Sequence, residues 1–246
     1  TFTTSEGVSL NGWMIKPANF DPTKKYPVIM HQYSGPGSQQ VTDSWSIGSM
    51  GNGGLFDYYL TQKGYIIVSV DGRGTGGRGA EFEKCTYLNI GDLESKDQVE
   101  AAIWLGKQDY IDATRIGIWG WSYGGFCTLM SMSEGRPVFK AGVSIAPPTN
   151  WRFYDSIYTE RFMRTPQENP TGYALNPLVR AKNLRLGRRQ RPSAECLRVF
   201  RGTCAGGQGL QGEHLYQPQS QHLWWQHPQS FAAPGSRVVL RESLNE

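Results

Sequence analysis

Arg115-Ile-Gly-Ile-Trp-Gly-Trp-Ser-Tyr-Gly-Gly-Phe126 is the stretch on which the interpretation of the whole chain rests. Its first part, Arg115–Trp119, is rich in β-branched and aromatic residues and predicts a buried strand. The apolar residues Phe126–Met132 predict a helix. Between the two lies Gly120-Trp-Ser-Tyr-Gly124, which satisfies the pattern G-x-S-x-G directly after a strand and before a helix. The stretch therefore predicts a nucleophile elbow, a strand–turn–helix unit with Ser122 at the turn.

Chemistry explains why glycines flank this serine. A turn tight enough to hold a serine in a strained conformation needs small residues on both sides, here Gly120 and Gly124. The turn lifts the hydroxyl group of Ser122 above the edge of the sheet, and the following helix N-terminus favours negative charge. The backbone N–H of Tyr123 is then placed to stabilise an oxyanion. The alternative is a glycine-rich turn that merely contains a serine, and the flanking strand and helix favour the elbow.

Outward from this unit, most of the chain alternates between strands and helices. Apolar and β-branched runs predict strands at Tyr26–Tyr33, Tyr65–Asp71 and Ala141–Ala146. Helical spacing predicts a helix at Gly54–Gly64, whose last glycine suits a C-cap. Asp92–Gln108 has an apolar stripe opposite charged residues and acidic residues in its first turn, as in an amphipathic helix. Apolar strands separated by helices predict an α/β fold, a mainly parallel sheet with helices on both faces.

The composition fits one soluble α/β domain. The 246 residues include 38% hydrophobic and 19% charged residues, as in globular proteins. No apolar run approaches the roughly 20 residues that span a bilayer. A net charge of +4 is too small to indicate a nucleic-acid partner, and the four cysteines lie too far apart for metal-binding pairs. We therefore expect no nucleic acid and no metal.

The start of the chain, Thr1–Asn11, has no initiator Met, no basic segment and no apolar stretch. These features predict that no signal peptide is present and that the chain is a piece of something longer.

Four segments, in order along the chain, resemble the prolyl oligopeptidase family, and within it the dipeptidyl peptidase IV branch. They are Gln32–Gln39, Val70–Gly79, the serine segment Arg115–Phe126, and Trp151–Arg161. The resemblance covers residues 1–184 and implies the peptidase domain of an α/β-hydrolase, with the family's upstream β-propeller absent from this chain. It implies a serine peptidase that releases N-terminal X-Pro dipeptides through an acyl-enzyme at its serine.

The resemblance also implies roles for several aromatic side chains. Tyr33 would be a second oxyanion donor, through its phenol, beside the N–H of Tyr123. Trp151, Tyr154 and Tyr158 would form the wall of an apolar pocket sized for proline, because a flat pyrrolidine ring packs well on aromatic faces. By position alone, Tyr33 fits a buried tyrosine at a strand end, and the other three fit an ordinary aromatic core.

Partners and location follow from the same resemblance. The substrates would be peptides with proline at the second position, and the intact protein could form a homodimer. The location would be extracytoplasmic, meaning periplasmic, secreted or membrane-attached.

No cofactor is expected, although one loop matches a dinucleotide-binding pattern. Gly72-Arg-Gly-Thr-Gly-Gly77 satisfies G-x-G-x-x-G and follows a strand. In a dinucleotide-binding fold the helix opens within the glycine run itself. Here the next clear helix is expected only near Asp92, so the loop does not predict a nucleotide site.

The character of the sequence changes after Leu184. Residues 185–246 are dominated by Gln, Gly, Pro and Arg. Their apolar residues recur with neither the two-residue period of a strand nor the 3.6-residue period of a helix. We expect an irregular tail and a sheet without its last strands. A serine hydrolase of this fold needs an acid and then a histidine after the serine. The only candidates in the tail lack the family's surroundings: His214, His222, His227, Glu195, Glu213, Glu242 and Glu246.

A shifted reading frame explains this tail. Back-translation of Arg188–Cys196 with permitted codons, reread one nucleotide later, gives Asp-Asp-Asn-Val-His-Leu-Gln-Asn, the family's acid-bearing turn. The same treatment of Gln217–His227 gives Asn-Arg-Asn-His-Ser-Ile-Tyr-Gly-Gly-Asn-Thr, the histidine segment. We infer a short deletion near Arg185–Gly187.

The sequence therefore predicts a serine peptidase of the dipeptidyl peptidase type by descent, inactive as written because its acid and histidine are missing. One alternative is an acylaminoacyl peptidase or esterase on the same fold. The other is a non-catalytic remnant that acts as a binding module. The aromatic segment from Trp151 to Tyr158 favours a proline pocket, and the intact elbow disfavours a pure scaffold.

Overall fold

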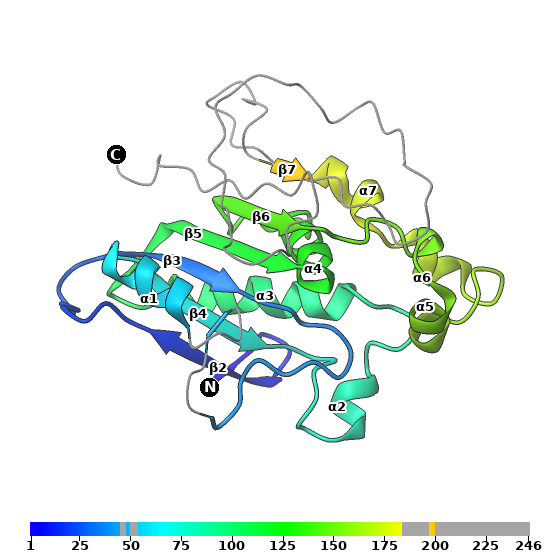
Figure 1. The fold of residues 1–246 in the computed structure, drawn as a ribbon, viewed down its shortest axis with the longest axis horizontal. Helices are drawn as coiled ribbons and strands as arrows, with labels where there is room; N and C mark the ends of the chain where they lie inside the picture. Colours follow the sequence, from blue (N-terminus) through cyan, green and yellow to red (C-terminus); the bar gives the residue numbers. More distant parts are fainter. Residues whose placement is uncertain (45–47, 50–53, 184–196, 200–246) are drawn as a thin grey trace.

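The computed structural model describes residues 1–44, 48–49, 54–183 and 197–199. Its centre is a seven-stranded sheet in the order β1-β2-β4-β3-β5-β6-β7 (Figure 1). The strands are β1 Phe2–Thr3, β2 Ser9–Ile15, β3 Tyr26–His31, β4 Ile66–Asp71, β5 Ile111–Trp121, β6 Ala141–Ile145 and β7 Leu197–Val199.

Most of the sheet is parallel. The pairs β4–β3, β3–β5, β5–β6 and β6–β7 are parallel, whereas β1–β2 and β2–β4 are antiparallel. The predicted mainly parallel sheet is thus confirmed. The antiparallel edge was not predicted, because polar Asn11 and the glycine after it interrupt the alternation of Ser9–Ile15.

Seven α-helices are described, together with 3₁₀ turns at Trp151–Phe153 and Ala181–Asn183. The α-helices are α1 Leu55–Gln62, α2 Ala80–Lys84, α3 Asp92–Leu105, α4 Tyr123–Met132, α5 Ser156–Met163, α6 Pro170–Ala174 and α7 Pro177–Arg180. None of these helices is long and apolar enough to cross a membrane.

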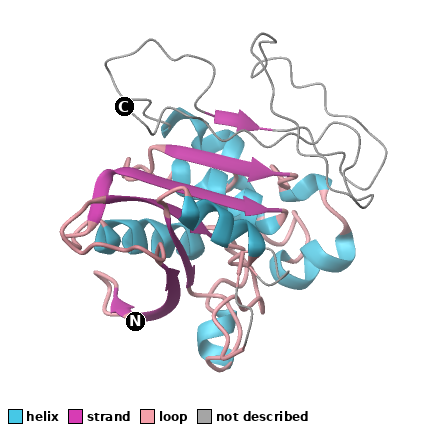
Figure 2. Cartoon of the chain, turned by 60° about the vertical axis from the view of Figure 1, so that its left-hand side comes forward, coloured by secondary structure: helices cyan, strands magenta, loops and turns pink. Residues whose placement is uncertain are grey.

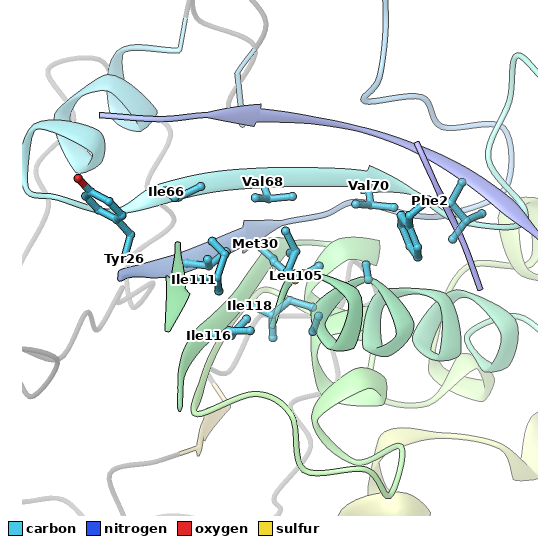
Figure 3. Packing of buried hydrophobic residues seen from close by; sticks show 14 residues of the cluster. Phe2, Tyr26, Met30, Ile66, Val68, Val70, Leu105, Ile111, Ile116 and Ile118 are labelled. Atoms are coloured by element: carbon cyan, nitrogen blue, oxygen red, sulfur yellow. The ribbon is translucent and has the colours of Figure 1, made fainter. Parts of the chain in front are cut away.

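The strands are buried on both faces of the sheet. On β4, Val68 and Val70 pack in one cluster with Leu105 of α3, whereas Ile67 packs in another cluster with Leu60 of α1. Successive side chains of a strand point to opposite faces, so α1 and α3 cover opposite sides (Figures 1 and 2). Figure 3 shows the α3-side cluster at the centre of the core. The predicted helices on both faces are confirmed.

Helix α1 ends as its sequence predicts. Gly64 follows the C-cap Lys63 with φ 87°, in the left-handed region that glycine tolerates. The N–H of Gly64 donates to the carbonyl of Thr61 at 3.0 Å, and the N–H of Tyr65 donates to that of Leu60 at 3.2 Å. These two bonds form a Schellman motif and lead directly into β4.

Helix α3 differs from its predicted pattern. Its apolar residues Val99, Ala102 and Leu105 are buried as expected, but Glu94 and Asp97 are also fully buried rather than facing solvent. Each buried carboxylate has a specific donor: Asp97 binds the guanidinium group of Arg73 at 2.7 Å, and Glu94 binds a tyrosine hydroxyl. Bonds with partners elsewhere in the fold compensate the cost of burying these two carboxylates. Hydrophobic periodicity within the helix does not reveal such partners.

A short helix that follows the glycine-rich loop was missed by the sequence analysis. Helix α2 begins at Ala80, well before Asp92, and the expectation of no earlier helix was wrong. A helix of five residues is too short to show a period. The loop lies against the segment after β3: the N–H of Gly37 donates to the carbonyl of Gly74 at 3.0 Å, and that of Gly76 donates to Ser38 at 2.9 Å.

The expectation of an irregular tail without further strands needs one correction. Leu197–Val199 forms the short strand β7, paired in parallel with β6. The free edge of β6 offers unpaired N–H and C=O groups, which a short segment can pair with using its backbone alone. The inferred deletion, the three tail histidines and the four tail acids lie outside the described residues.

The ion pair beneath the glycine-rich loop provides a test of the fold. Burial raises the pKa of Asp97, and its hydrogen bonds with Arg73 oppose that shift. Without the Asp97 charge, the buried Arg73 guanidinium would keep only the exposed Glu6 carboxylate, at 2.6 Å, as an ion-pair partner, and a buried charge that loses a partner is costly. We expect Asp97→Asn to lower the free energy of unfolding by about 3 kcal/mol, measured by urea denaturation. The exposed Lys24→Ala, which breaks the Lys24–Asp21 pair, should leave the midpoint unchanged.

Candidate active site

The backbone at Ser122 has the strained conformation that the sequence predicts. Ser122 lies between β5 and α4 with φ 57° and ψ −117°, in the left-handed half of conformational space. Such a conformation costs on the order of 1–3 kcal/mol and persists only where surrounding bonds fix it. Here the N–H of Ser122 donates to the carbonyl of Ile145 at 2.8 Å, and the N–H of Phe126 donates to that of Ser122 at 3.0 Å.

Close backbone contacts explain the glycines around Ser122. A Cβ atom at Gly120 would lie 2.5 Å from the carbonyl oxygen of Gln32, and one at Gly124 would lie 2.4 Å from that same oxygen. A Cβ atom at Gly125 would lie 2.7 Å from the carbonyl oxygen of Ile145. Any side chain at these positions would force the neighbouring backbone apart, so the turn requires glycine at each.

Tyr123 presents its backbone and its side chain to different surroundings. As the first residue of α4, its N–H has no acceptor within the helix. The helix dipole places partial positive charge at this end. The side chain points inward and is 2% exposed, and its hydroxyl donates to Oε1 of Glu94 at 2.8 Å. The N–H is thus available to an anion while the ring anchors the turn.

Gln32 connects the end of β3 to the elbow. Its Nε2 donates to the carbonyl of Gly124 at 2.5 Å and to Oγ1 of Thr128 at 3.0 Å. The next residue, Tyr33, is half-buried, and its ring centroid lies 6.2 Å from that of Tyr123. The structure therefore brings the rings of Tyr33 and Tyr123 near each other, although the two residues are far apart in sequence.

The three predicted pocket residues form one aromatic cluster that continues from Tyr123. The ring of Trp151 lies 5.6 Å from that of Tyr123, 5.6 Å from that of Tyr154 and 5.9 Å from that of Tyr158. Trp151 is buried, Tyr158 is half-buried and Tyr154 is exposed. This gradient from core to solvent is typical of the wall of an open apolar site. The buried Trp151 equally fits the core interpretation.

Burial dominates the electrostatics of the site. It raises the pKa of Glu94 to about 7, and it raises the pKa of Tyr123 and Tyr158 well above their usual range. The one histidine among the described residues, His31, lies against Trp119, and burial lowers its pKa to about 4. Within the described ranges, no three His, Cys, Asp or Glu side chains group together as a metal site would require.

Sequence reasoning missed the roles of Gln32 and Glu94. A signal for Glu94 existed, because it lies three residues after Gly91 and its side chain accepts the N–H of Gly91 at 2.9 Å, as in a capping box. The acidic first turn was assigned to the helix dipole instead. For Gln32 no local pattern existed, because its partners follow it by 92 and 96 residues.

The comparison with known families agrees with this geometry. The model of the prolyl oligopeptidase family matches residues 56–194, which include the elbow, the glycine-rich loop and the aromatic cluster. The chain belongs to the prolyl oligopeptidase family. The predicted family and the predicted α/β-hydrolase fold are thereby confirmed.

Individual relatives are similar over the same part of the chain. A protein named "Probable dipeptidyl-aminopeptidase B" from Coccidioides posadasii is 48% identical over 171 residues, which cover 69% of this chain and 18% of the relative. One of the same name from Phaeosphaeria nodorum is 49% identical over 170 residues, covering 68% and 18%. The crystal structure of Porphyromonas gingivalis dipeptidyl peptidase 4 matches with 54% identity and a TM-score of 0.69, covering 74% of this chain and 25% of that one. The chain thus spans about a fifth of the length of its curated relatives.

Two glycines of β5 provide a matched test of the elbow. A Cβ atom at Gly120 would lie 2.5 Å from the carbonyl oxygen of Gln32, whereas one at Gly117 would lie at an ordinary 3.5 Å from that of Ala141. We expect Gly120→Ala to destabilise the fold by about 3 kcal/mol through overpacking, and Gly117→Ala by less than about 1 kcal/mol. Equal urea midpoints for the two variants would contradict the close contact.

Proposed function

We propose that this chain carries the nucleophile, the oxyanion donors and the proline pocket of a serine peptidase of the dipeptidyl peptidase type. The observation that carries the proposal is the strained Ser122 turn, whose neighbour Tyr123 is continuous with the aromatic cluster of Trp151, Tyr154 and Tyr158. A scaffold has no use for a strained serine at a helix N-terminus, whereas acyl transfer needs one.

The proposed reaction is an acyl transfer in two steps. The Ser122 oxygen attacks the carbonyl carbon of the proline residue and loses its proton to a histidine base. The oxyanion accepts hydrogen bonds from the N–H of Tyr123 and the phenol of Tyr33. The C–N bond breaks, the amine leaves with the proton from the histidine, and an X-Pro ester of Ser122 remains. Water then hydrolyses this ester and restores the serine.

Substrate class follows from the aromatic cluster. A pyrrolidine ring is flat, apolar and without an N–H in peptide linkage, so it packs on aromatic faces without leaving a polar group unpaired. The rings of Trp151 and Tyr158 stack at an interplanar angle of 23°, with Tyr154 edge-on to both. This arrangement supports peptides with proline at the second position over esters or acylated amino acids. The names of the relatives, dipeptidyl-aminopeptidase B and dipeptidyl peptidase 4, support the release of dipeptides.

Location and assembly are proposed for the intact protein on the family resemblance alone. We propose an extracytoplasmic location and a homodimer. A fusion of the full-length coding sequence to a reporter that is active only outside the cytoplasm tests the location. Light scattering of the full-length protein tests the dimer.

The decisive test is whether the 246-residue chain, with its present tail, has peptidase activity. Its acid and histidine lack the family's surroundings, and loss of such groups costs orders of magnitude in rate. We therefore expect release of the chromophore from a Gly-Pro substrate to be no faster than with Ser122→Ala. Resequencing the coding DNA across codons 180 to 195 should show the inferred deletion or restore the frame.

A chain expressed from the restored frame should cleave the Gly-Pro substrate and leave an acylated amino-acid substrate largely uncut. Preference for the acylated substrate would instead support the acylaminoacyl alternative. Failure of an active-serine phosphonate to label Ser122 in the restored chain would support a non-catalytic binding module.

A further inference from the structure

Glu94 lies at the centre of an unusual arrangement in the first turn of α3. Its side chain is fully buried, and both carboxylate oxygens have partners. Oε2 accepts the N–H of Gly91 at 2.9 Å, and Oε1 accepts the hydroxyl of Tyr123 at 2.8 Å. One carboxylate thus joins the N-terminus of α3 to the residue that follows Ser122.

Packing around this bond leaves the Tyr123 side chain little freedom. A Cβ atom at Gly35 would lie 3.0 Å from the Tyr123 ring, so the loop after β3 passes close to that ring. On other sides the ring contacts Phe126 and Trp151, at centroid distances of 5.3 and 5.6 Å. A Cβ atom at Gly91 would lie 2.5 Å from the Phe126 ring, so α3 and α4 approach closely here. These contacts restrict rotation of the Tyr123 ring about its own side-chain bonds, which favours transmission of a change at its hydroxyl to its backbone.

We propose that Glu94 is a positioning residue, which holds the Tyr123 phenol and thereby keeps the Tyr123 N–H at the oxyanion site beside Ser122. The inference rests on the proposed function only where it assigns the Tyr123 N–H as a donor to the oxyanion. The mechanical link from carboxylate to backbone N–H stands on the contacts alone.

Protonation of Glu94 changes this link. Burial raises its pKa to about 7. Hydrogen bonds from its own backbone N–H, from Tyr123 and from Gly91 oppose this rise, and the charge of Asp97 adds a smaller contribution to it. The other titratable groups that face it are Cys85, Cys127 and Tyr158. Ionised Glu94 accepts a charge-assisted bond from the Tyr123 hydroxyl. Protonated Glu94 donates to the phenol oxygen instead, so the bond reverses direction and weakens.

The variant Glu94→Gln removes the charge of the carboxylate and keeps its contacts with Gly91 and Tyr123. The new carboxamide accepts the N–H of Gly91 through its oxygen and donates to the phenol oxygen of Tyr123, as protonated Glu94 does. The variant retains both contacts and should fold, but it cannot titrate. Glu100→Gln is the matched control, because Glu100 lies on the same helix and binds Arg136, away from the elbow.

The decisive experiment is an NMR titration of the full chain labelled in the backbone amide of tyrosine, with Tyr123→Phe to assign the signal. We expect the Tyr123 amide shift to titrate with a midpoint near pH 7 in the wild type and in Glu100→Gln, and to stay constant in Glu94→Gln. A constant Tyr123 amide in the wild type would overturn the proposal, because a merely structural Glu94 leaves the backbone N–H unmoved. The readout needs no turnover, so a failure of the proposed peptidase function would not be confused with it.

Stability provides an independent second measurement. The pKa of Glu94 is raised on folding from 4.5 to about 7, so the folded state binds the proton more tightly than the unfolded state. Stability from this group is complete below about pH 4.5 and is lost as pH rises to 7. Between these limits, the urea midpoint of the wild type should fall relative to that of Glu94→Gln. Parallel curves would show that Glu94 has no raised pKa and would remove the basis for a titrating link.

Discussion

The close approach of one carbonyl oxygen to the serine turn is the constraint on which the active-site region depends. The oxygen of Gln32 lies where side chains at Gly120 and Gly124 would otherwise stand. This contact brings the end of β3 against both the end of β5 and the start of α4. Because the turn is clamped between β3 and Ile145 of β6, Ser122 can retain a conformation that an isolated peptide would leave.

Buried polar groups, rather than apolar packing alone, join the sheet to the loops at its edge. Glu94, Asp97 and Gln98 lie on the buried side of α3 and bind, respectively, Tyr123, Arg73 and the carbonyl of Val70. Each of these partners precedes or follows a loop at the carboxyl ends of the strands. A buried polar group is costly to leave unpaired, so these bonds specify a particular loop arrangement more strongly than interchangeable apolar contacts do.

Local sequence patterns were sufficient to predict the central strands and the elbow, but not the other elements and contacts. β4 and the second half of β5 are rich in apolar residues, and the glycines at 120 and 124 have the spacing of the elbow, so these strands and the elbow were predicted from the sequence. The first residues of β5, before Arg115, were not predicted, because Asp112 and Thr114 make them polar. β2 was missed because its exposed polar residues interrupt its alternation, and α2 because a single turn shows no period. Glu94 and Gln32 were missed for a different reason: their roles depend on partners 29 and 92 residues away. Neither the bond from Tyr123 to Glu94 nor the bond from Gln32 to Gly124 leaves a trace in a local window, and the local capping-box spacing of Glu94 indicates only its bond with Gly91.

The bond from Gln32 to Gly124 has a consequence for the entropy of the proposed reaction. It joins the residue before Tyr33 to the helix that begins with Tyr123, so the two proposed oxyanion donors are attached to backbone segments that are bonded to each other. In the proposed reaction, a negative charge that develops beside Ser122 would meet dipoles already in place. The disorder of these groups would then be lost once, when the polypeptide folds, and not again with each catalytic cycle.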